Sequence, residues 1–270
     1  MPFRTLFAII FCLSFSLPAH PTQALAQAKW TFMVFMTADN NLEEAGIEDF
    51  LEMSAVADSS LVNIVVQFDR IPGYVSSYDN WTDTRRFRVT QGMQPSAANG
   101  ASIGEANMGD PSTLVNFVNW ARTTYPADRY ALVLWDHGNG WKVRAPQTGA
   151  VRSISSDDSS SGNAITMPEL LQAMQLITTN GANPLDLVGF DACLMAMAEV
   201  DNQLVNYARV RAGSEDLEPG DGWDYTATLS ALVANPDLAP AGLGSRVVLD
   251  YYSSYDGETQ SAVDLENGYA

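Results

Sequence analysis

The chain has 270 residues, 46% of them hydrophobic, which is enough to form one large α/β core. Its formal charge is −18, from 32 acidic and 14 basic side chains. Such acidity argues against binding to nucleic acid or to anionic membrane surfaces, and it would attract cationic substrates. A role of the charge in solubility alone is the alternative interpretation.

Residues 1–26 have the features of a secretory signal peptide. Arg4 precedes an apolar run from Leu6 to Leu17, and Ala24-Leu25-Ala26 is a small-x-small cleavage site. The run is shorter than the roughly 20 residues that a membrane-spanning helix needs. We therefore expect a secreted or periplasmic protein with no membrane attachment after cleavage, and a single domain over residues 27–270.

Cleavage would leave one cysteine and one histidine in the chain. It removes Cys12 and His20, so that Cys193 and His137 remain. A lone cysteine cannot form an internal disulfide, and its presence in an exported protein calls for a chemical reason. This composition excludes a zinc site of the Cys/His type, and no metal ligands are predicted.

Short apolar runs alternate with amphipathic stretches, which predicts an α/β fold. The predicted strands are 29–37, 62–68, 84–90 at a sheet edge, 130–135, 185–190 and 208–212, and the predicted helices are 42–56, 111–124, 166–178, 226–233 and 243–252. Residues 96–110 are expected to form a loop. The last residues resemble the start of another strand, so we expect a fragment that is truncated at its carboxyl end.

The polar segment 142–164 has no apolar periodicity and is predicted to be a loop. Loops longer than about 12–15 residues in a compact domain are usually functional or disordered. This one carries three basic residues, Lys142, Arg144 and Arg152.

The remaining cysteine and histidine each follow a predicted buried strand. His137 comes after 130–135, and Cys193 comes after 185–190. A helix predicted from Leu194 onward would place Cys193 at a helix amino end, where free N–H groups and the helix dipole favour a thiolate. Taken separately, Cys193 could be a small buried hydrophobe, and His137 could be a hydrogen-bonded structural residue.

Together the two residues have the chemistry of a cysteine nucleophile and its base. Such a site needs a base for the thiol, a proton donor for the leaving amine, and N–H groups directed at the developing oxyanion. His137 can serve as base and donor. The backbone N–H groups of Gly138 and Cys193 are predicted to form the oxyanion site.

Four motifs are separated along the chain: TADNNLE (37–43), LWDHGNGW (134–141), GFDACLMAMAEV (189–200) and SEDLEPGDGWDY (214–225). Together they resemble the clostripain family of cysteine peptidases, which are relatives of caspases and gingipains. In caspases, too, the histidine lies about 50 residues before the cysteine.

The resemblance implies a caspase-like three-layer sandwich, with a mostly parallel central sheet and helices on both faces, and a His137–Cys193 catalytic dyad. Family members cleave after arginine, sometimes lysine, and their pocket acids correspond to Asp191 and Asp221. A helix-capping role for Asp191 and a turn role for Asp221 are the alternatives. The expected partners are peptides or proteins with Arg or Lys, and we expect a monomer.

The resemblance also implies maturation by cleavage at a basic residue of the 142–164 loop, with Lys142, Arg144 and Arg152 as candidates. Some relatives depend on calcium, but no Asp-x-Asp-x-Asp-Gly loop is present, so calcium remains an open question. Two other functions stay open: a non-catalytic exported binding domain of the same fold, and a caspase-fold peptidase of another specificity.

Overall fold

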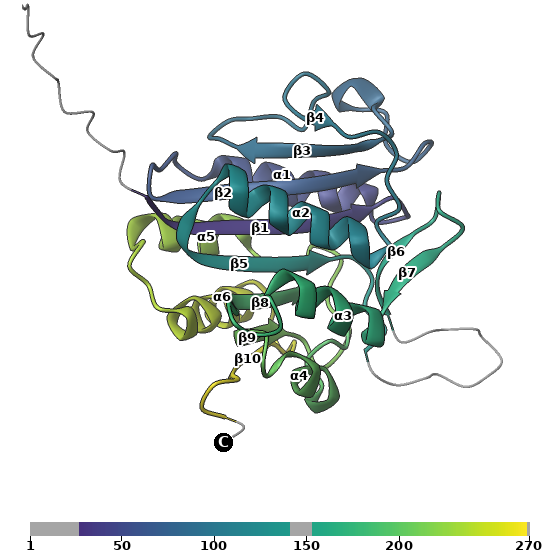
Figure 1. The fold of residues 1–270 in the computed structure, drawn as a ribbon. Helices are drawn as coiled ribbons and strands as arrows, with labels where there is room; N and C mark the ends of the chain where they lie inside the picture. The colour runs from purple at the N-terminus through teal and green to yellow at the C-terminus, as the bar shows by residue number, and fades with distance from the viewer. Residues whose placement is uncertain (1–26, 141–152, 269–270) are drawn as a thin grey trace, which may run out of the picture.

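The computed structural model describes residues 27–140 and 153–268, and its centre is an eight-stranded sheet. The strands of this sheet are β1 (Ala28–Ala38), β2 (Val62–Arg70), β3 (Thr84–Val89), β4 (Ala101–Ser102), β5 (Ala127–Trp135), β8 (Leu185–Asp191), β9 (Ala208–Gly213) and β10 (Ser261–Asp264). Their spatial order is β10-β9-β8-β5-β1-β2-β3-β4. The inner strands from β9 to β2 are parallel, whereas β3, β4 and β10 run antiparallel to their neighbours (Figure 1).

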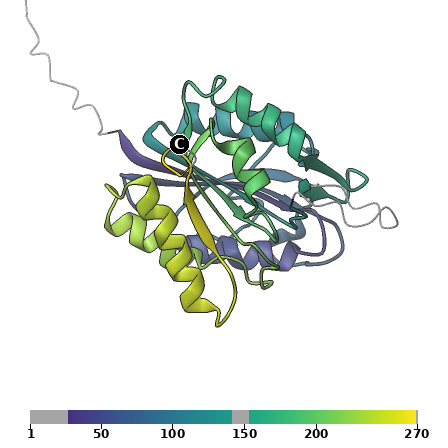
Figure 2. The same ribbon diagram turned by 90° about the horizontal axis from the view of Figure 1, so that it is seen from below.

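Helices cover both faces of the sheet. The helices are α1 (Glu43–Ala55), α2 (Pro111–Thr124), α3 (Met167–Ile177), α4 (Ala198–Leu204), α5 (Tyr225–Ala234) and α6 (Pro240–Ser254). One face packs against α1, α5 and α6, and the other packs against α2, α3 and α4 (Figure 2). The predicted three-layer α/β fold is confirmed.

The position of strand β1 in the sheet explains why its sequence is continuously apolar. It lies between β5 and β2, so both of its faces are covered by helices. Side chains alternate across a strand, so Phe32, Val34 and Met36 enter one core, while Met33 and Phe35 enter the other. All five are fully buried.

The segment predicted as a loop over 142–164 contains a hairpin, so that prediction was wrong for its second half. Strands β6 (Ser153–Asp157) and β7 (Asn163–Thr166) pair antiparallel as a separate two-stranded sheet. Only Ile154 and Ile165 are apolar and buried there, too few for a visible hydrophobic pattern. The predicted loop over 96–110 likewise contains the two-residue strand β4, which covers the edge of β3.

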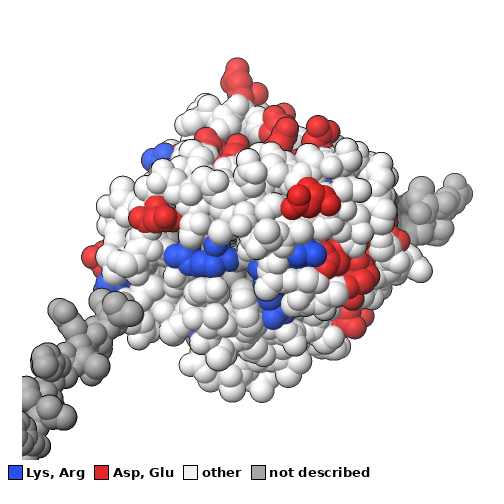
Figure 3. All heavy atoms as spheres, turned by 90° about the horizontal axis from the view of Figure 1, so that it is seen from above, with Lys and Arg blue, Asp and Glu red and all other residues white. Residues whose placement is uncertain are grey.

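Among the helices in the described ranges, none combines the length and the hydropathy of a membrane span. The face of the molecule nearest the β3–β4 edge carries a short band of basic atoms between acidic groups (Figure 3). In this view the basic surface does not extend into the broad patch that nucleic acids require.

Candidate active site

Strands β5 and β8 are neighbours, and their register brings the histidine and cysteine turns together. Trp135, at the end of β5, pairs with Asp191, at the end of β8. The pairing extends one residue further, because the backbone N–H of Asp136 donates to the Asp191 carbonyl at 3.2 Å. His137 and Cys193 therefore leave the same edge of the sheet at the same level, each two residues beyond a paired position.

Gly138 packs directly against the backbone of Cys193. A Cβ atom at residue 138 would lie 2.2 Å from the Cys193 carbonyl oxygen and 3.0 Å from its nitrogen. Only glycine allows this approach. The two peptide units predicted to form the oxyanion site are thus adjacent.

His137 and Cys193 line one pocket of about 220 Å³. The loop over 214–222 forms much of its wall through Leu217, Glu218 and the two glycines that flank residue 221. Asp191 also lines it, from the end of β8.

The Cys193 side chain is half-buried and has a backbone donor. The N–H of Glu218 donates to Sγ of Cys193 at 3.3 Å. Burial raises the pKa of the Cys193 thiol, and the charges of Glu218 and Asp191 raise it further, whereas the Glu218 N–H opposes them. The thiol form is therefore favoured while the pocket contains no positive charge.

The helix predicted to begin directly after Cys193 begins further along the chain. The prediction that a helix dipole stabilises the Cys193 thiolate was therefore wrong. Helix α4 starts at Ala198. Leu194 has a left-handed backbone with φ of 64°. The N–H groups of Leu194 and Ala196 donate to the carbonyls of Asp216 and Ser214 instead of entering a helix.

His137 is oriented by a side chain from the opposite turn. Its Nε2 lies 2.9 Å from Oδ1 of Asn41, between β1 and α1. A carbonyl oxygen can only accept, so Nε2 carries the proton and Nδ1 is left as the free base. Burial lowers the pKa of His137, which keeps the imidazole neutral. Sequence reasoning assigned Asn41 no role in the site, although it lies within the TADNNLE motif.

Asp191, which lines the pocket, is tightly packed by the residues around it. It is buried, and its Oδ2 accepts from the Tyr225 hydroxyl at 2.8 Å. Gly222, with φ of +55°, packs so closely that an added Cβ would lie 2.8 Å from Asp191 Oδ1. Burial raises the Asp191 pKa to about 7, while the hydrogen bond from Tyr225 opposes that rise.

Two further carboxyl groups surround Asp191. Glu218 accepts from Gln260 at 3.2 Å, and Asp49 accepts from the indole N–H of Trp135. Burial, followed by the charge of Asp191, raises the pKa of both. Within residues 27–140 and 153–268, no Lys or Arg forms an ion pair with any of the three carboxyls. No basic side chain of the described residues therefore neutralises this group of carboxyls.

Comparison with known proteins identifies the family. The model of the clostripain family matches residues 34–266. This chain belongs to the clostripain family.

Three relatives show the extent of the likeness. Clostripain of Hathewaya histolytica is 32% identical over 195 residues, which are 65% of this chain but 36% of clostripain. A secreted C11 cysteine protease from Bacteroides thetaiotaomicron, solved with an irreversible peptide inhibitor, has a TM-score of 0.67 and 26% identity, over 88% of this chain and 66% of that one. An inactive zymogen C11 protease from Parabacteroides distasonis has a TM-score of 0.65 and 20% identity, over 89% and 63% of the two chains.

This chain thus spans about a third of the length of clostripain and just under two thirds of the two solved C11 proteases. At 20% identity, the zymogen supports the fold alone. The family predicted from the motifs is confirmed by the family model and by clostripain, and the predicted fold is confirmed by the two solved structures.

Of the two acids predicted for the pocket of this clostripain-family chain, Asp191 lines it and Asp221 does not. Asp221 is exposed and does not line the pocket, although Gly220 and Gly222 on either side of it do. Glu218, three residues earlier, places its carboxyl inside. The SEDLEPGDGWDY motif contains both acids, and nothing in its spacing shows which one faces inward.

The processing candidates Lys142, Arg144 and Arg152 lie outside the described residues. The described chain resumes at Ser153, where β6 begins, and Ile154 of that strand forms a β-bridge with Gly138. The start of β6 therefore lies next to the histidine turn.

Proposed function

We propose that this chain is the peptidase domain of a cysteine endopeptidase that cleaves after arginine, or after lysine. One observation carries the proposal: Cys193 and His137 line a pocket that is also lined by the buried Asp191. The proposed nucleophile, its proposed base and the proposed cation-binding acid therefore line the same pocket.

In the proposed reaction, Sγ of Cys193 attacks the carbonyl carbon of the scissile bond. Nδ1 of His137 takes the thiol proton and returns it to the leaving amine, which gives a thioester and a free amine. Water, deprotonated by the same imidazole, then hydrolyses the thioester and regenerates the thiol. Asn41 is a positioning residue that holds the imidazole in the required tautomer.

The N–H groups of Gly138 and Cys193 are the proposed donors to the oxyanion. The close approach of Gly138 to the Cys193 backbone brings both peptide units to one place. Donors held by the fold need no reorganisation when charge develops on the substrate oxygen.

The specificity follows from the charge of the pocket. Burial disfavours the charged forms of Asp191 and Glu218, and a guanidinium bound between them would compensate their charge. The planar N–H donors of a guanidinium also match the geometry of a carboxylate. A lysine ammonium offers the same charge with fewer fixed donors. An aspartyl side chain in this pocket would be repelled.

The relatives support the chemistry. The protein that is 32% identical is clostripain, and the solved neighbour at 26% identity is a secreted cysteine protease bound to a peptide inhibitor. The binding of a peptide inhibitor by that protease supports the proposal that this chain acts on peptides.

We further propose export after removal of residues 1–26 and self-cleavage after Lys142, Arg144 or Arg152. Support comes from the cleavage-site pattern at Ala26 and from the β-bridge between Gly138, in the histidine turn, and Ile154, close after the three basic residues. Mass spectrometry of the purified protein tests both steps: a new amino terminus at Gln27, and a cut after one of the three basic residues that disappears in Cys193→Ala.

The dyad is tested with an arginyl-amide reporter. Cys193→Ala should abolish hydrolysis while the far-UV circular dichroism is unchanged, and exposed Glu44→Gln serves as the control that retains activity. Full turnover by Cys193→Ala would contradict the assignment. Rates with lysyl, alanyl and aspartyl reporters then establish the specificity, and an aspartyl preference would contradict the acidic pocket.

Iodoacetamide separates the peptidase from a non-catalytic binding domain. The half-buried Cys193 of a peptidase should be alkylated at neutral pH, and a saturating peptide that ends in arginine should slow the reaction. A thiol that stays unlabelled would support the binding domain.

A further inference from the structure

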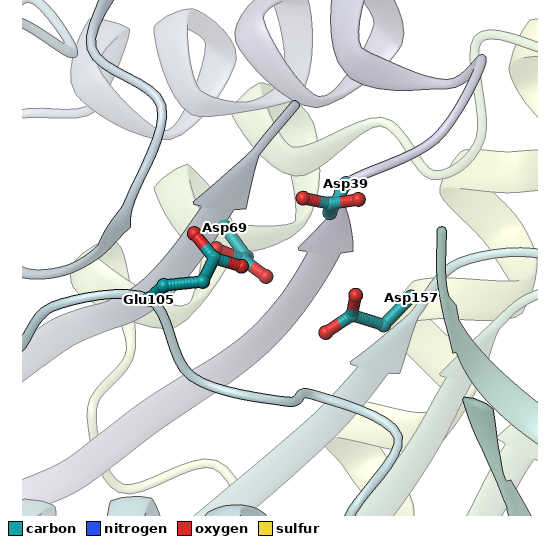
Figure 4. A group of neighbouring side chains, drawn as sticks. All are labelled: Asp39, Asp69, Glu105 and Asp157. Atoms are coloured by element: carbon teal, nitrogen blue, oxygen red, sulfur yellow. The ribbon is translucent and has the colours of Figure 1, made fainter. Parts of the chain in front are cut away.

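Four carboxyl groups converge at the end of the sheet where β1 and β2 terminate (Figure 4). They come from the ends of three strands and from the loop before α2. The four residues are Asp39 after β1, Asp69 in β2, Glu105 before α2, and Asp157 at the end of β6.

Their oxygens have the spacing of ligands to a single ion. One oxygen from each side chain lies within 4.8 Å of the others. Two ligands on opposite sides of a calcium ion are about 4.6–5.2 Å apart, since each Ca–O bond is about 2.3–2.6 Å. The set is compact enough for all four to bind one ion.

Two of these carboxyl groups each have one buried oxygen with no hydrogen-bond partner. Asp39 and Asp69 are both 0% exposed, and Oδ2 of each accepts no hydrogen bond. The other oxygen of each is held: Asp39 Oδ1 accepts from the Ser159 N–H at 2.7 Å, and Asp69 Oδ1 accepts from the Thr84 hydroxyl at 2.8 Å. A buried carboxylate oxygen that the protein leaves unpaired is costly, and a cation would compensate it.

No basic side chain of the described residues neutralises the group. Arg70, which follows Asp69, turns to Glu43 with an Nε–Oε1 distance of 2.6 Å, and both of those side chains are fully buried. The nearby Arg85 pairs with Asp83. The four carboxyls therefore face one another without a positive charge between them.

We propose that Asp39, Asp69, Glu105 and Asp157 form a calcium-binding site. Calcium takes six to eight oxygen ligands in flexible geometry, and anionic carboxylates are its usual protein ligands, with water completing the shell. Magnesium is bound through one or two carboxylates and keeps most of its water, so a set of four favours calcium. All four ligands are hard oxygens, which argues against zinc or copper.

The proposed calcium site is linked, through the β1–α1 turn, to both His137 and the β6–β7 hairpin. Asp39 is followed by Asn40, whose amide donates to Asp136 at 2.8 Å and to the Ser156 carbonyl at 3.0 Å. Asn41 comes next and accepts from His137. An ion bound by Asp39 and Asp157 would therefore fix the β1–α1 turn and the β6–β7 hairpin in the positions that orient His137.

Binding is measured on chelator-treated full-length Cys193→Ala protein, which cannot cleave itself, by isothermal titration calorimetry and thermal unfolding. Calcium should bind in a saturable manner and raise the unfolding temperature, and magnesium should bind at least about tenfold more weakly. Glu105→Gln, at an exposed position that tolerates the change, should weaken calcium binding by roughly tenfold or more. Asp69→Asn should do the same and keep the acceptor for Thr84.

Glu44→Gln removes an exposed carboxyl elsewhere and should bind calcium like the parent protein. In chelator, Glu105→Gln should be at least as stable as the parent, because it relieves repulsion, whereas in calcium it should be less stable. Absence of saturable calcium binding, unchanged affinity in Glu105→Gln, or equal affinity for magnesium would overturn the proposal. These readouts do not depend on peptidase activity, so they remain valid if the proposed function fails.

Discussion

The backbone N–H of Glu218 donates to Sγ of Cys193 at 3.3 Å, and the carboxyl of the same residue lies beside Asp191 in the pocket. Glu218 therefore acts on the nucleophile in two opposed ways. Its N–H stabilises a thiolate and lowers the Cys193 pKa, whereas its negative charge raises that pKa.

Removing the negative charge of Glu218 while keeping its backbone N–H should lower the pKa of the Cys193 thiol. In Glu218→Gln, the pH profile of iodoacetamide alkylation should shift to lower pH, because one of the charges that raise the Cys193 pKa is gone. Glu215→Gln, at an exposed position of the same loop, should leave the profile unchanged. A shift to higher pH in Glu218→Gln would contradict this account.

Asp191 should make substrate binding depend on pH around neutrality. Its pKa is raised to about 7, so the carboxyl becomes charged as the pH rises through that value. The KM for an arginyl reporter should therefore fall between pH 6 and 8. A citrullyl reporter, which has the same shape without the charge, is the control. If both reporters changed equally, Asp191 would not be the group that binds the cation.

Asp191→Asn should make the protein more stable at pH 8 and less active toward arginyl substrates. A carboxyl whose folded pKa lies above its unfolded value contributes most to stability at low pH, and this contribution is lost as the pH rises through the folded pKa. At pH 8 the buried charge is therefore unfavourable, by up to about 4 kcal/mol. Asp191→Asn should raise the free energy of unfolding at pH 8, have little effect at pH 4, and lose most kcat/KM for arginyl substrates. Urea denaturation at both pH values measures the change in the free energy of unfolding. If Asp191→Asn were less stable than the parent protein at pH 8, this explanation would be contradicted.

Asn41 should control the protonation of His137. Burial places the His137 pKa below 6.5, so kcat/KM should rise with pH through a value in that range. In Asn41→Asp the added negative charge favours the imidazolium and should move this acidic limb upward. In Asn41→Ala the orienting acceptor is lost, and kcat should fall by about 10- to 100-fold with a smaller change in KM. Unchanged pH profiles in both variants would remove Asn41 from the site.

Gly138→Ala should disrupt the site by steric conflict. Its Cβ would lie 2.2 Å from the Cys193 carbonyl oxygen, which is backbone and cannot move aside cheaply. We expect a loss of about 1–3 kcal/mol of stability together with most activity. Gly220→Ala is the matched control for stability, since open space surrounds that position. Thermal unfolding of the two variants makes the comparison, and equal midpoints would show that the turn has room that this structure does not provide.

The sequence determined the fold class and the family, and it singled out the two groups that we propose to react. Strands such as β1 and β5 are buried on both faces, so their apolar runs are long enough to be recognised without tertiary information. Because parallel strands deliver the residues after their carboxyl ends to one edge, His137 and Cys193 could be expected to meet. Their chemistry needed only that each be the single residue of its kind after Ala26.

The tertiary structure decided the surroundings of those groups. Asn41 and Glu218 come from distant segments, and which acid of the 214–225 loop faces inward depends on packing that leaves no periodic pattern. The helix expected at Leu194 was wrong because long-range hydrogen bonds to Ser214 and Asp216 replace the local ones. The proposed calcium ligands are spread from residue 39 to residue 157, so no sequence spacing could reveal them; folding alone brings them together.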